Sequence, residues 1–79
     1  MDKSDQLHAM LTVCRNLGAE VDYCQERNYF TAMVWEDERL SADASRARLI
    51  QKQIQKKTAQ YPGLVCYCFD PFSTLVYMV

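Results

Sequence analysis

The feature that most constrains the fold is an apolar segment with a single charged residue, GLVCYCFDPFSTLVYMV at positions 63–79. Its two β-rich runs are separated by Asp70-Pro71, and aspartate followed by proline is typical of the start of a type I turn. Side chains alternate between the two faces of a strand, and both alternating sets are apolar here. The segment therefore predicts a β-hairpin without a polar face.

A helix is predicted over Ser4–Leu17, because apolar residues recur there at spacings of three and four. The members of this stripe are Leu7, Met10, Leu11, Cys14 and Leu17. Ser4 is the expected N-cap, and Gly18 is placed to end the helix in a left-handed conformation. The only histidine, His8, is expected on the polar side of the helix, away from Cys14.

Two further elements are predicted between this helix and the apolar segment. Val21–Trp35 is expected to form a hairpin, because aromatic and β-branched residues flank a polar turn at 26–28. Positions 41–61 predict a second helix, strongest over 43–60, with Ser41 or Asp43 as its cap. Pro62-Gly63 is expected to end that helix. Its apolar side consists of Ala47, Ile50, Ile54 and Tyr61.

The order along the 79-residue chain is therefore helix, hairpin, helix, hairpin, in one domain covering residues 1–79. We expect an α+β fold of order αββαββ, a four-stranded and mostly antiparallel sheet with both helices packed on one face. A shift of 44 positions lays VDYC (21–24) on VCYC (65–68), which suggests a pseudo-repeat of 1–40 and 41–79. The alternative is that the two halves are not duplicated, and that similar packing requirements alone gave them this weak similarity.

Two helices on one face of a sheet leave the opposite face without cover. In the second hairpin that face would carry Tyr67, Phe69 and Tyr77, and large exposed apolar patches usually mark interfaces. We therefore expect a homodimer, or a contact with another protein, through these residues. Val79 and Trp35 are further expected contacts. The alternative is that the aromatic face is partly exposed and curls onto loops.

Opposite charges are concentrated in two consecutive blocks. Positions 20–43 contain seven acidic and two basic residues, whereas positions 45–60 contain five basic residues and no acidic one. The five are Arg46, Arg48, Lys52, Lys56 and Lys57. A basic helix suits contact with nucleic acid or with an acidic partner, which is the alternative function. The net charge of −1 favours instead a solvated helix whose cations balance the acidic block.

The four cysteines lack the two close pairs that are usual in a structural zinc site. Cys66 and Cys68 form one close pair, and Cys14 and Cys24 would have to approach them in space to complete four thiolates. We interpret all four as small buried apolar residues, and we expect neither a metal nor a cofactor. No catalytic residues are assigned, because a cysteine nucleophile would need His8 as a neighbour.

These patterns predict a small non-enzymatic interaction protein that blocks or regulates a protein partner. The start of the chain does not resemble a signal peptide, and no run of 18 apolar residues occurs, so we expect a cytoplasmic protein that does not bind membranes. By association alone, a short chain without motifs suggests an accessory protein of a phage or mobile element.

Overall fold

The computed structural model of the chain describes residues 2–34 and 45–79. The elements are α1 (Lys3–Asn16), β1 (Glu20–Cys24), β2 (Tyr29–Met33), α2 (Ser45–Thr58), β3 (Leu64–Asp70) and β4 (Ser73–Met78). Both helices pack on the four-stranded sheet, so the predicted α+β fold and the order αββαββ are confirmed. Neither helix in the described ranges is long and apolar enough to cross a bilayer.

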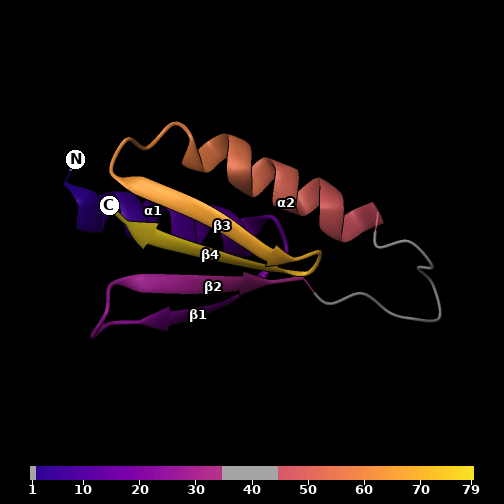
Figure 1. Cartoon of the computed structure of the whole chain (residues 1–79), viewed down its shortest axis with the longest axis horizontal. Helices are drawn as coiled ribbons and strands as arrows, with labels where there is room; N and C mark the ends of the chain where they lie inside the picture. Colours follow the sequence, from indigo (N-terminus) through magenta and orange to yellow (C-terminus); the bar gives the residue numbers. More distant parts are fainter. Residues whose placement is uncertain (1, 35–44) are drawn as a thin grey trace.

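The strands are arranged in the order β1-β2-β4-β3, and every neighbouring pair is antiparallel. The two hairpins therefore meet through their second strands, β2 and β4, which form the centre of the sheet (Figure 1). α1 packs behind the sheet, mainly against β1 and β4, while α2 packs along β3. Neither α1 nor α2 covers the opposite face of the sheet, which we call the outer face.

The core lies between the helices and the inner face of the sheet. Its fully buried large side chains include Phe30 and Val76 from the central strands, Leu7 and Met10 from α1, and Ile54 from α2. Burial follows the alternation of the strands, because every second residue of β2 points inward. The same alternation sends the intervening residues of β2, β3 and β4 to the outer face.

α1 begins one residue earlier than predicted, and the prediction of Ser4 as its N-cap is wrong. Asp2 is the N-cap, with an extended backbone and a carboxylate that accepts a hydrogen bond of 2.8 Å from the backbone N–H of Asp5. The cap therefore lies three residues before the N–H that it satisfies. Gly18 has φ of +99°, which confirms the left-handed end of the helix.

α2 ends at Thr58, earlier than the sequence pattern predicts. The backbone N–H groups of Gln60 and Tyr61 bond to carbonyls three residues back, so the chain tightens before Pro62. The N–H of Gly63 then bonds to the side chain of Gln6 at 3.0 Å, which ties this turn to α1. The predicted caps of α2, Ser41 and Asp43, lie outside the described residues, as does Trp35.

The similarity between VDYC and VCYC does not correspond to equivalent positions in the sheet. Val21 and Tyr23 pack against the core, whereas the matched Val65 and Tyr67 pair with Tyr77 and Leu75 on the outer face. The central ladder nevertheless pairs Thr31 with Leu75, two positions that are 44 apart. The pseudo-repeat thus remains a prediction, and the similarity between VDYC and VCYC does not support it.

Candidate interaction surface

The register of the sheet brings aromatic residues from three strands together on the outer face. Tyr29 of β2 lies opposite Tyr77 of β4, and Leu75 of β4 lies opposite Tyr67 of β3. Direct partners in an antiparallel pair project from the same face. Phe69 follows Tyr67 at an irregularity in β3, where the pairing skips from Cys68 to Asp70. Such bulges redirect side chains locally.

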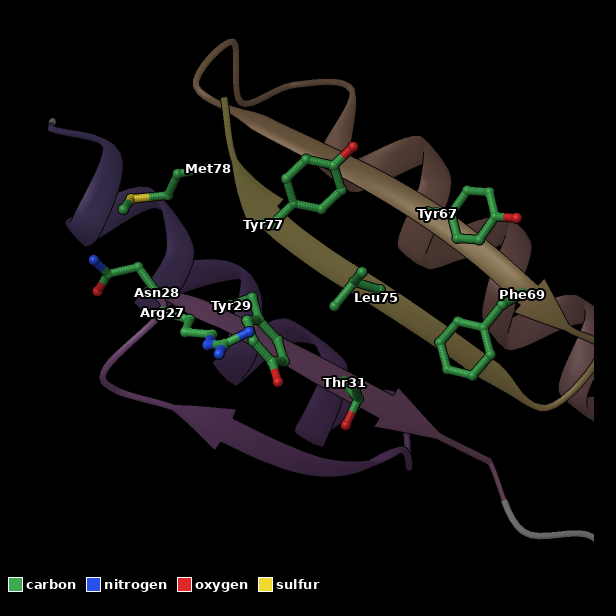
Figure 2. Close-up of a pocket in the computed structure, with 9 residues that line it drawn as sticks. All are labelled: Arg27, Asn28, Tyr29, Thr31, Tyr67, Phe69, Leu75, Tyr77 and Met78. Atoms are coloured by element: carbon green, nitrogen blue, oxygen red, sulfur yellow. The ribbon is translucent and has the colours of Figure 1, made fainter.

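These side chains surround an open hollow of about 700 Å³, which we call the aromatic hollow. It is lined by Arg27, Asn28, Tyr29, Thr31, Tyr67, Phe69, Leu75, Tyr77 and Met78. Figure 2 shows Leu75 between the rings, with Tyr67 and Phe69 on the side of β3 and Tyr29 on the side of β2. An aliphatic floor between aromatic walls is suited to receive an apolar side chain.

The rings of the hollow are exposed to a degree that is unusual for aromatic residues. Tyr67 is 59 % exposed, Phe69 is 50 % exposed and Tyr77 is 37 % exposed. The outer face of a half-solvated antiparallel sheet normally carries polar residues instead. The alternative, in which the aromatic face curls onto loops, is not seen in the described part of the chain.

The structure thus brings Tyr67, Phe69 and Tyr77 together, as the hairpin pattern predicts. Val79 is exposed but does not line the hollow, and its N–H bonds to the carbonyl of Gly63. Tyr29 was missed, because nothing local in the sequence indicates that β2 lies beside β4.

Acidic side chains lie around the hollow without lining it. Asp22 is the cross-strand neighbour of Thr31 on the outer face, Glu20 is the neighbour of Met33, and Asp70 follows Phe69. We call Glu20, Asp22 and Asp70 the acidic margin. Among the described residues, Arg27, in the turn between β1 and β2, is the only charged one that lines the hollow. Together with Arg27, the acidic margin gives the surroundings of the hollow a net charge of 1 − 3 = −2.

The basic residues of α2 lie in the other layer of the molecule (Figure 1). Arg48, Lys52 and Lys56 are exposed and form no ion pair with any residue in the described ranges. Arg46 is also exposed, while Lys57 is half-buried. Their helix packs on the inner face along β3, so these cations and the aromatic hollow are not parts of one site.

The two layers carry opposite net charges. α1 and α2 contain seven basic residues and one acidic residue, Asp5, giving 7 − 1 = +6. The sheet and its two turns contain four acidic residues and one basic residue, giving 1 − 4 = −3. The latter are Glu20, Asp22, Glu26 and Asp70 with Arg27.

The cysteines do not form the four-thiolate arrangement that the sequence left open. Cys24 lies opposite Tyr29 on the outer face, whereas Cys66 lies opposite the buried Val76. Among the residues that the structure describes, no three His, Cys, Asp or Glu side chains are placed to hold a metal ion. A four-cysteine site that includes Cys24 is therefore contradicted by the geometry.

The inner thiols are also poor nucleophiles. Burial raises the pKa of Cys14 to about 12, with a smaller contribution from Cys66. Burial likewise raises the pKa of Cys66 to about 12, helped by the neighbouring Cys68 and opposed by a hydrogen bond with Thr58. Such thiols stay protonated at neutral pH, and the thiolate is the reactive form.

His8 lies on the exposed side of α1, as predicted. Its Nδ1 is 2.8 Å from the carbonyl oxygen of Ser4, and its ring lies 5.2 Å from the ring of Tyr23, centroid to centroid. Cys14 is fully buried and lies about 120° around the helix from His8. His8 therefore contributes to local packing and is not paired with that thiol.

Comparisons with protein-family models, with curated proteins and with solved structures find nothing that matches this chain.

Proposed function

We propose that this chain is a non-enzymatic interaction protein that binds a protein partner through the aromatic hollow, and so blocks or regulates that partner. The observation that supports the proposal is the exposure of Tyr67, Phe69 and Tyr77 around the floor formed by Leu75. Tyrosine is well suited to such a surface, since its ring supplies contact area while its hydroxyl remains hydrated in the free protein.

The area of these rings indicates the size of the partner. An aromatic side chain presents roughly 200 Å² when fully exposed, so the exposed fractions leave roughly 300 Å² of ring surface in water. Covering that surface contributes about 7 kcal/mol at about 25 cal/mol per Å². Association itself costs about 4–15 kcal/mol. A stable complex therefore needs contacts beyond the hollow, which a protein surface provides and a small ligand does not.

Replacing Tyr67 and Tyr77 together by serine is expected to weaken partner binding at least about 100-fold, because buried aromatic anchors commonly contribute about 2 kcal/mol or more each. The tagged wild-type chain would first be used to capture and identify the partner from cells that produce it. Titration calorimetry with the purified partner would then measure the dissociation constants of both chains.

Phe72→Ser is the matched control, because Phe72 is also exposed and lies in the same hairpin but does not line the hollow. It is expected to change the dissociation constant less than about threefold, as residues outside a hot spot do. If the Tyr67→Ser/Tyr77→Ser chain is folded by circular dichroism and binds as tightly as the wild type, the hollow is not the binding site.

A second candidate function is nucleic-acid binding through α2, which is supported by the row of exposed cations Arg48, Lys52 and Lys56 at four-residue spacing. Replacing all three by glutamine is expected to flatten the salt dependence of binding to duplex DNA by a slope of roughly 2.7, which corresponds to three lost phosphate contacts. Fluorescence anisotropy with a labelled duplex measures this slope. If the wild type shows no salt-dependent binding, this candidate fails.

A further inference from the structure

We propose that the aromatic hollow receives the exposed face of α2 from a second copy of the chain, so that copies associate head to tail. This inference rests on the proposed role of the hollow as a docking surface, and it names the partner of that surface. The two surfaces that would meet lie in different layers of each molecule, so each copy can offer both at once.

The exposed face of α2 carries an apolar anchor among cations. Leu49 is 66 % exposed, although it is a large apolar residue in a helix whose inner face is buried. Lys52 and Lys56 follow it by three and seven residues and therefore share its side of the helix. Both are exposed, and neither forms an ion pair within the described ranges. This face thus presents one aliphatic side chain with positive charge on one side of it.

The hollow and its acidic margin complement that face. Leu75 forms the floor on β4, and Asp22 lies two strands away in the same cross-strand row, through Thr31. Two strand spacings amount to about 10 Å. On a helix, Leu49 and Lys56 are separated by about 10.5 Å along the axis. A copy of α2 that lies across the strands with Leu49 over Leu75 therefore brings Lys56 close to Asp22.

Charge favours the α2 face of a second copy over two other candidates for the hollow, a second outer face and a nucleic acid. A face-to-face contact between two outer faces brings two acidic margins together, which is unfavourable for like charges. A nucleic acid would place its phosphates beside the same carboxylates. The α2 face instead has the opposite sign. A contact between two different surfaces leaves one hollow and one α2 face unoccupied at the ends of the assembly. Further copies therefore add until the geometry closes a ring, or they continue into a filament.

The first test compares the association of the wild-type chain with that of variants in which charged residues at the contact are reversed. By sedimentation of the purified chain at low salt, we expect the average mass to rise with concentration beyond that of a dimer and to fall as salt is added. Leu49→Ser, Lys56→Glu and Asp22→Lys are each expected to weaken association at least tenfold. The double variant Asp22→Lys/Lys56→Glu is expected to recover it. Ser4→Ala, at an exposed position of α1 outside both surfaces, should leave it unchanged.

Mixing two defective variants tests the head-to-tail geometry directly. Leu49→Ser keeps the hollow and lacks the anchor, whereas Tyr67→Ser/Tyr77→Ser keeps the anchor and lacks the hollow. Each alone is expected to be monomeric, and the mixture is expected to form a one-to-one pair that does not grow further. Circular dichroism of every variant establishes that loss of association does not reflect unfolding.

A wild-type chain that stays monomeric at every concentration and salt overturns the inference. A dimer that Leu49→Ser leaves intact overturns it as well, because the contact then excludes α2. Neither result bears on a foreign partner, whose binding to the hollow is measured separately by the tyrosine variants. The failure of the head-to-tail contact and the failure of the proposed function are therefore distinguishable.

Discussion

Replacing Phe30 by alanine is expected to remove a large part of the stability of this domain. Phe30 is fully buried on β2, a central strand, where it lies between Tyr23 of β1 and Val76 of β4. Truncation of a buried phenylalanine to alanine costs about 3–5 kcal/mol. At roughly 0.05–0.15 kcal/mol per residue, the whole domain is stable by only about 4–12 kcal/mol. The loss is therefore between about a quarter of the total stability and all of it.

Thermal unfolding followed by circular dichroism measures this effect. A loss of 1 kcal/mol lowers Tm by about 4–8 °C in a domain of this size, so we expect a fall of at least about 12 °C. Phe72→Ala is the control, because Phe72 is partly exposed in the turn between β3 and β4, and it should lower Tm much less. A Tm for Phe30→Ala within a few degrees of the wild type contradicts the placement of this ring at the centre of the core.

The thiol of Cys14 is expected to be alkylated about a thousandfold more slowly in the folded chain than in the chain unfolded by denaturant. Burial raises its pKa from the usual 9.0 to about 12, which lowers the thiolate fraction at pH 8 by about a thousandfold. The raised pKa also means that the unfolded chain loses this proton first. The free energy of unfolding is therefore expected to fall as the pH rises from about 9 to about 12.

Mass spectrometry of proteolytic peptides after timed exposure to iodoacetamide measures the rate at each cysteine. Cys24 serves as the internal reference, because it lies on the outer face in the edge strand β1, outside the core. Alkylation of Cys14 at a rate similar to that of Cys24 in the folded chain would show that α1 does not cover this thiol.

Most of the fold follows from patterns that are local in the sequence. The stripe that includes Leu7 and Met10 predicts α1, and the alternation around Tyr67 correctly assigns that ring to the outer face. The N-cap was misplaced because Ser4 and Asp2 are both good caps, and the choice depends on backbone angles that the sequence does not display. Propensity therefore located the helix but not its first residue.

The composition of the candidate site depends on contacts between distant segments. Tyr29 joins the hollow only because β2 pairs with β4, and its partner Tyr77 is 48 positions away. Periodicity reports which residues share a face within one strand, but not which strands are neighbours. For the same reason the sequence did not show that Cys24 lies apart from the other cysteines, since its position on an edge strand follows from the order β1-β2-β4-β3.

The segregation of charge between the two layers gives the part of the chain that the structure describes an electric dipole, which points from the sheet to the helices. A body of this kind does not approach a charged surface in random orientations, because the field of the surface turns it before contact. It would meet a polyanion with α1 and α2 in front and a cationic surface with the strands in front. The first encounter with any charged partner is thus biased towards one side of the protein, at a rate that salt reduces.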